Sequence, residues 1–267
     1  APAPADQAPW YRDLSVHPRK IWFMVILISG ISFAGYVLGK VLGAGRGLIL
    51  TGVVGGLVSS TAVSLSYAQK SRTSPEHSRQ LAIGILLANA IMPVRLLVVV
   101  GVIAPLLLGP LALPLLAMSG VAAAASLVLY LRERAQPRQE QAVPLKNPFE
   151  LGPALQFGFL FGAVLFAAEV AQGFFGDAGL YAVAVVTGLT DVDAIGLAVA
   201  NMVADGSQAT SVGAITIALA ATTNTLVKGG FVVTAGSARL RKITLLSFGI
   251  MAAAAAGGIA LIWSGQA

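Results

Sequence analysis

Two apolar stretches of this chain, 132 residues apart, are similar in sequence. Residues 47–68 read GLILTGVVGGLVSSTAVSLSYA and residues 179–200 read GLYAVAVVTGLTDVDAIGLAVA, with nine identities in 22 ungapped positions. At the same offset, residues 82–88 match residues 214–220 at five of seven positions. Duplicated halves with polar residues inside apolar sequence are typical of membrane transporters. The similarity therefore predicts a chain built from two related halves.

The composition indicates that the solvent of this chain is lipid. Hydrophobic residues make up 57% of the chain and charged residues only 10%, whereas a soluble domain carries about 25% charged residues. The net charge of +6 comes from Lys and Arg in short loops, as in membrane proteins. We therefore expect no nucleic-acid partner, and a lipid bilayer around the protein.

Eight segments are long and apolar enough to cross a membrane, which needs about 20 such residues. Residues 132–150 are polar and contain three prolines, so they predict a linker between two membrane repeats at 21–131 and 151–264, after an N-terminal lead-in at 1–20. The segments are 22–41, 47–68, 79–103, 108–131, 153–174, 178–202, 209–235 and 241–264.

Loop charge favours an inverted arrangement of the two repeats. If segments 47–68 and 178–202 enter and leave on the same side, each repeat has three spans plus one re-entrant or broken segment. Four basic loops then share one face, which should be cytoplasmic: 40–46, 70–79, 132–146 and 239–242. The alternatives are eight plain spans in a parallel repeat, or an irregular segment at 79–103, which contains Pro93. In all three cases the fold class is an all-α polytopic membrane protein.

Two aspartates in the second copy of the repeat are the strongest candidate ion ligands. Asp191 and Asp193 follow Gly188 and Thr190, and a chain break at Gly188 would let both carboxylates face one ion. Oxygen ligands of this kind suit hard cations such as Mg²⁺, so the pair is a candidate metal site. The alternative is structural, with Asp191 as a helix N-cap and Asp193 as an ion-pair partner of Lys228.

The first copy of the repeat offers hydroxyl groups at the equivalent positions. Ser59, Ser60 and Thr61 fall opposite residues 191–193, and they follow Gly55 and Gly56, which are the candidate backbone break of this half. Their hydroxyls would complete the ion site. Serine and threonine in a membrane helix also commonly bond only their own helix backbone.

The other polar residues inside the apolar segments are candidates for charge balance or gating. Arg95 and Lys228 would balance the aspartates, gate the path or hold an anion, and Glu169 would reach the membrane interface. Asn89 and Asn224 are candidate ligands or interhelical hydrogen-bond donors.

Enzymatic chemistry has no support in the sequence. GVVGG lacks the lysine of a phosphate-binding loop, and the two histidines have no metal-ligand or triad spacing. We therefore expect no enzyme and no cofactor.

Several motifs together resemble a membrane domain found after MgtC/SapB-type domains in bacterial proteins. The motifs are GGLVSST, NPFELGPALQFG, GLTDVDA and NTLVKGG, and the similarity extends over residues 17–264. The resemblance implies the bacterial inner membrane, a role in magnesium homeostasis or acid adaptation, and an MgtC-like partner.

Together these observations predict a transporter or channel for a small inorganic ion, with a divalent cation favoured and an inorganic anion as the alternative substrate. Its site would lie near the bilayer midplane between the two broken segments. The alternative from another class is a non-transporting membrane regulator that binds a partner protein. The sequence leaves open whether the chain forms a homo-oligomer.

Overall fold

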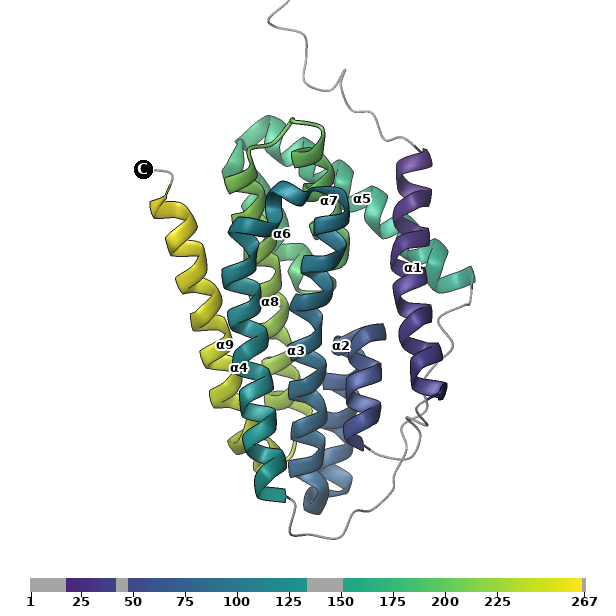
Figure 1. Ribbon diagram of the computed structural model, residues 1–267, viewed down its shortest axis with the longest axis vertical. Helices are drawn as coiled ribbons and strands as arrows, with labels where there is room; N and C mark the ends of the chain where they lie inside the picture. Colours follow the sequence, from purple (N-terminus) through teal and green to yellow (C-terminus); the bar gives the residue numbers. More distant parts are fainter. Residues whose placement is uncertain (1–17, 42–47, 134–150, 266–267) are drawn as a thin grey trace, which may run out of the picture.

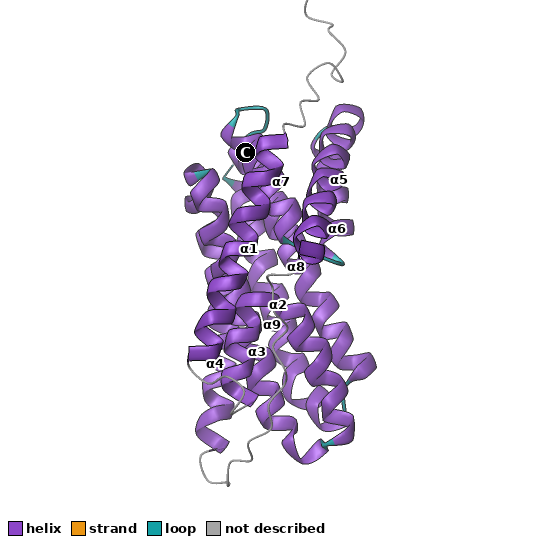
Figure 2. Ribbon diagram, turned by 90° about the vertical axis from the view of Figure 1, so that its right-hand side faces the viewer, coloured by secondary structure: helices purple, strands orange, loops and turns teal. Residues whose placement is uncertain are grey.

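A computed structural model describes residues 18–41, 48–133 and 151–265, and these residues form helices and short connections without a strand (Figures 1 and 2). The lead-in up to residue 17, the loop 42–47 and most of the linker lie outside the described residues. The helices are α1 (Pro18–Val41), α2 (Leu48–Thr73), η4 (Pro75–His77), α3 (Ser78–Ile103), η5 (Pro105–Leu107), α4 (Leu108–Glu133), α5 (Leu151–Phe175), α6 (Asp177–Gly188), α7 (Asp193–Ala204), α8 (Thr210–Ala235) and α9 (Ala238–Ser264).

Five of these helices are long and apolar enough to cross a membrane: Pro75–Ile103, Pro105–Arg132, Leu155–Phe175, Thr210–Ala235 and Ala238–Ser264. Many of their large apolar side chains face outward, including Phe159, which is 81% exposed. A surface of this kind suits lipid rather than water. The prediction of an all-α, multi-pass membrane protein is therefore confirmed at this level.

The two segments predicted to be irregular are the ones that break. Ser59 inside α2 has φ −160° and ψ 100°, which separates a first half-helix from a second. The segment 178–202 is two helices of 12 residues each, α6 and α7. Each is about 18 Å long, too short for the roughly 30 Å hydrocarbon core. The alternative of eight unbroken spans is therefore wrong. The alternative of an irregular segment at 79–103 is also wrong, because α3 continues as a helix through Pro93.

One break falls at its predicted glycine, since α6 ends at Gly188, whereas the break in α2 falls at Ser59, beyond Gly55 and Gly56. Gly55 and Gly56 are helical and precede the break at Ser59, and Gly188 ends α6. Two of these glycines also allow close helix packing: a Cβ on Gly56 would lie 2.6 Å from Ala88 Cα, and one on Gly188 would lie 2.7 Å from the Ala220 carbonyl oxygen. Gly56 and Ala88 are 32 residues apart, as are Gly188 and Ala220. The two pairs are offset by 132 residues, so they are equivalent contacts in the two copies of the repeat.

The helices pack along the chain within each half and across the halves at the centre. α3 lies against α2 and α4, and α8 lies against α6 and α9. Across the halves, α2 contacts α8 and α3 contacts α7. In Figure 1, α2 occupies the lower part of the molecule, whereas α6 and α7 occupy the upper part.

The two ends of the molecule differ in charge. At the lower end, the turns after α2 and α8 are held together because the Ser237 backbone N–H donates to Ser71 Oγ at 2.8 Å and Arg72 donates to the Thr234 carbonyl. The basic residues Lys70, Arg79, Arg239, Arg241 and Lys242 flank these turns. At the upper end, Gln208 donates to Asp177 at 3.2 Å and joins the loops that follow α5 and α7. The predicted basic loops that the structure describes therefore meet at one end.

The glycine contacts give the first prediction. In an open helix position, Gly→Ala stabilises by roughly 0.5–1 kcal/mol. At Gly56 and Gly188 the added Cβ meets backbone atoms, so Gly56→Ala and Gly188→Ala should instead destabilise by about 1–3 kcal/mol. The measurement is thermal unfolding in detergent. Gly120→Ala is the matched control, since nothing lies within 4 Å of its Cβ position. Equal behaviour of all three variants would contradict the packing role.

Candidate functional site

The two backbone breaks meet at the centre of the molecule and enclose a small polar cavity. Its volume is about 50 Å³. One water needs about 10–15 Å³ by this kind of measure, so the central cavity has room for a few waters or one small ion. It is lined by Val58, Ser59, Ser60, Thr61, Met92, Arg95, Asp191, Val192, Asp193 and Asn224.

The second half-helix of each break begins with an N-cap at the equivalent repeat position. Ser59 Oγ accepts a hydrogen bond from the Ala62 backbone N–H at 3.2 Å. Asp191 Oδ1 accepts from the backbone N–H groups of Asp193 at 2.7 Å and Ala194 at 3.1 Å. Asp191 therefore caps the start of α7 through its Oδ1, as the structural alternative in the sequence analysis proposed. Helix starts need such acceptors because their first N–H groups have no partner within the helix.

The first half-helix of each break ends on a side-chain donor from a neighbouring helix. Arg95 Nη1 on α3 donates to the Leu57 carbonyl oxygen at 2.8 Å. Asn224 Nδ2 on α8 donates to the Gly188 carbonyl oxygen at 3.1 Å. Asn224 thus acts as a hydrogen-bond donor between helices while it also lines the cavity.

Arg95 also joins the two halves through an ion pair. Its Nη2 donates to Asp193 Oδ2, and both side chains are largely buried, at 10% and 6% exposure. Arg95 was expected to balance the aspartates, and it pairs with Asp193; the alternative pairing of Asp193 with Lys228 is wrong. Arg95 takes the carboxylate because it reaches α7 across the α3–α7 contact.

Lys228 instead approaches the cavity from its other side. Its side chain is fully buried, and Nζ donates to Ser60 Oγ at 2.8 Å. Ser60, at 5% exposure, also lines the cavity. A single hydroxyl therefore faces both the cavity and a buried ammonium group.

One carboxylate oxygen in the cavity wall has no protein partner. Asp193 is 4% exposed, and its Oδ1 makes no hydrogen bond to any described residue. An unpaired buried carboxylate oxygen is costly, because burial removes the water that would otherwise solvate it. Asp193 also lines the central cavity, so a ligand in that cavity would lie next to this carboxylate.

Seven predicted site residues do not line the cavity, and three of them, Lys228, Gly56 and Gly188, are described above. Asn89 Nδ2 donates to the Ile85 carbonyl oxygen at 2.8 Å and to Ser64 Oγ at 3.1 Å, so it joins α3 to α2. Thr190 is exposed and bonds the Thr187 carbonyl oxygen. Glu169 lies half-buried on α5, and Gly55 lies one turn before the break.

Three apolar residues of the cavity wall were not predicted from the sequence. Val58 and Val192 line the cavity next to the breaks, and Met92 lines it from α3. Val58 and Val192 lie inside the two repeat windows, so their position was a usable signal. Met92 lies one helical turn before Arg95, which would have marked the same face.

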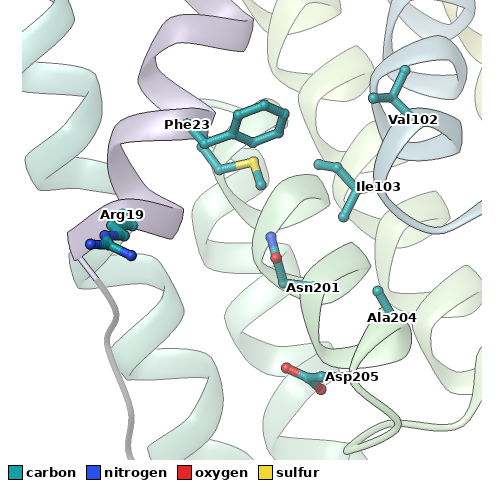
Figure 3. A pocket seen from close by; sticks show the side chains of 8 residues that line it. Arg19, Phe23, Val102, Ile103, Asn201, Ala204 and Asp205 are labelled. Atoms are coloured by element: carbon teal, nitrogen blue, oxygen red, sulfur yellow. The ribbon is translucent and has the colours of Figure 1, made fainter.

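A second and larger cavity lies at the upper end of the molecule, between α1, α3 and α7 (Figure 3). We call it the upper vestibule. Its volume is about 490 Å³, and its walls are mainly apolar, with polar side chains on α1 and α7. It is lined by Arg19, Phe23, Met24, Val102, Ile103, Asn201, Ala204 and Asp205.

Comparison with known proteins places the chain in a family. Residues 26–236 match a domain of unknown function, DUF4010. The chain belongs to the DUF4010 family. The chain is also 31% identical over 194 residues to an uncharacterized protein from Aquifex aeolicus (strain VF5). The aligned region covers 73% of this chain and 84% of the relative. No solved structure matches.

The Arg95–Asp193 pair gives the second prediction. Removing one member of a buried ion pair typically costs about 3–5 kcal/mol because the other charge stays buried and unpaired. Arg95→Met should therefore lower the unfolding temperature in detergent strongly. Adding Asp193→Leu should recover part of that loss. A double variant whose loss equals the sum of the two single losses would show that the pair is not coupled.

Proposed function

We propose that this DUF4010 protein is a membrane transporter for a small inorganic cation, and that the central cavity is its binding site. The observation that carries the proposal is Asp193, which lines this cavity and whose buried Oδ1 has no protein partner. A cation supplies the missing interaction.

The charges of the cavity wall favour a monovalent cation. The wall holds one positive side chain, Arg95, and two negative ones, Asp191 and Asp193, a net charge of −1. Two of the four carboxylate oxygens already serve Arg95 and the start of α7. What remains is too little negative charge for Mg²⁺, the cation type that the sequence pattern favoured, but it balances one Na⁺ or K⁺.

The ligand types also favour a cation over an anion. The hydroxyls of Ser59, Ser60 and Thr61 supply neutral oxygens of the kind that hard cations bind. An anion would be expected at a helix N-terminus. At α7 that position is already taken by the Asp191 carboxylate.

Lys228 acts in this proposal as a tethered positive charge beside the ion site. With its ammonium group present, the four ionisable side chains around the centre sum to zero, so the charge of a bound cation is balanced only when the ammonium group loses its proton or withdraws from Ser60. Its hydrogen bond to Ser60 occupies one of the ion's oxygen ligands. A bound cation therefore competes with Lys228 for Ser60, which keeps the occupied and empty sites close in energy, as transport requires.

The repeat supplies the transport mechanism. In our proposal the halves form an inverted repeat, in which α1, α3 and α4 correspond to α5, α8 and α9 as crossings. The broken segments α2 and α6–α7 correspond as re-entrant elements that come from opposite ends. The equivalent contacts of Gly56 and Gly188 support this relation. Rocking of one half against the other then opens the midplane site to each side in turn.

The lower end of the molecule, where the basic residues gather, lies in the cytoplasm in this proposal. The membrane is the bacterial inner membrane. The resemblance to MgtC-associated domains leaves a partner protein of that type as part of the same hypothesis.

A flux assay gives the third prediction. The purified full-length chain in vesicles should carry Na⁺ or K⁺ down a gradient, and Asp193→Asn should lower that flux at least tenfold by removing the charge that binds the ion. Asp191→Asn should lower it less, since asparagine still caps a helix. Asp177→Asn is the matched control, because Asp177 lies at the upper end away from the cavity.

The same assay separates the alternatives. Flux of Mg²⁺ or of chloride in place of Na⁺ and K⁺ would contradict the proposed valence or sign. The absence of flux for any ion would instead favour a non-transporting membrane regulator.

Sidedness gives the fourth prediction. The natural chain has no cysteine, so single-cysteine variants can be labelled directly. Glu76→Cys at the lower end and Ser207→Cys at the upper end should react with an impermeant thiol reagent from opposite faces of the membrane, Glu76→Cys from the cytoplasmic face. Both residues are exposed. Labelling of both from one face would overturn the inverted arrangement.

A further inference from the structure

The central cavity and the upper vestibule lie along one seam, formed by α3 and α7. Met92 and Arg95 of α3 and Asp193 of α7 line the central cavity. Val102 of α3 and Asn201 of α7 line the vestibule. Both helices therefore lead from one cavity to the other, and Figure 3 shows Val102 and Ile103 of α3 opposite Asn201 and Ala204 of α7 at the vestibule.

Between the two cavities the seam is closed by apolar side chains packed on a glycine. A Cβ on Gly196 of α7 would lie only 2.8 Å from Leu96 Cδ1 and 3.8 Å from Val100 Cγ2. Leu96 and Val100 are both fully buried. Leu96 therefore occupies the space beside Gly196 that a side chain at that position would otherwise fill.

The closed contact is thin. Gly196 lies three residues beyond Asp193, about 4.5 Å along the axis of α7, and Asn201 lies five residues further, about 7.5 Å. Only about two helical turns therefore separate the ion site from the vestibule. An apolar constriction of this length excludes water and ions without any charged group.

We propose that Leu96 and Val100, packed on Gly196, form the gate that closes the central site toward the upper vestibule. This inference rests on the proposed function, because a gate is needed only if the central cavity takes up an ion. Separation of α3 from α7 at Gly196 opens the path, and their contact closes it. The vestibule is then the entry for the ion, with Asn201 and Asp205 as polar groups at its inner wall.

The other side of the central site is closed by a different contact. At the repeat-equivalent position of Leu96, the second half has Lys228, which reaches Ser60 of α2. The structure thus places an apolar contact on the upper side and a charged, hydrogen-bonded contact on the lower side. The two contacts involve different helix pairs, α3–α7 and α8–α2.

The test uses single-cysteine reporters in the otherwise cysteine-free chain. Asn201→Cys reports on the vestibule, and Thr61→Cys reports on the central cavity. An impermeant thiol reagent is added to sealed vesicles of each orientation. From the side that labels Asn201→Cys, Thr61→Cys should react slowly. Adding Leu96→Ala should raise the labelling rate of Thr61→Cys from that side at least tenfold.

Leu115→Ala is the matched control, since Leu115 is an equally buried leucine on α4. It removes the same atoms away from the seam and should leave Thr61→Cys labelling unchanged. The gate is overturned if Leu96→Ala has no effect, if Leu115→Ala has the same effect, or if Asn201→Cys reacts from neither side.

Labelling needs no transported ion, so the outcome separates the two proposals. Faster labelling in Leu96→Ala without any ion flux in the natural chain would keep the gate as a water barrier and reject the transporter. Ion flux with unchanged labelling would keep the transporter and place its upper gate elsewhere.

Discussion

The central constraint on this structure is that two apolar segments break at the centre of the molecule. Each break leaves backbone carbonyls at the end of one half-helix and N–H groups at the start of the next, and lipid offers these groups no partner. The protein supplies the partners from its own side chains. Arg95 and Asn224 donate to the carbonyls, and Ser59 and Asp191 accept from the N–H groups. A polar cluster in an otherwise apolar chain is therefore a requirement of the breaks, and the cavity is its consequence.

Arg95 shows how capping and function use the same residues. A guanidinium group has five donors in a fixed plane, so it can serve two backbone carbonyls and a carboxylate at once. It thereby joins the end of the first half-helix of α2 to the start of α7. A lysine has a compact charge without this geometry. The second half has lysine near the same place, and it makes one hydrogen bond to a serine instead.

Much of the fold was predictable because membrane segments are read from length and polarity, which are local properties. The helix bounds agree within a few residues, and the irregular segments were found from glycine, hydroxyl groups and loop charge. Glycine marked the break after α6, which ends at Gly188. It did not mark the break in α2, which falls three residues beyond Gly56, at Ser59. Gly56 and Gly188 were predicted as points of backbone flexibility. Their second role, close packing against Ala88 and Ala220, depends on the tertiary arrangement and was not predictable from the sequence. The ion-pair partner of Asp193 was not predictable for the same reason, because sequence distance gives no preference between Arg95 and Lys228.

The repeat makes the differences between the halves more informative than the identities. Equivalent caps are serine in one half and aspartate in the other, so the negative charge of the cavity comes from the second half alone. The residue at the repeat-equivalent position of Leu96 is Lys228, which contacts Ser60 of α2. An exact duplication would give two equal contacts on either side of the cavity. Divergence at these few positions gives one apolar contact, one hydrogen-bonded contact and a buried carboxylate oxygen without a partner, and this asymmetry fits the proposed ion carrier with a defined site.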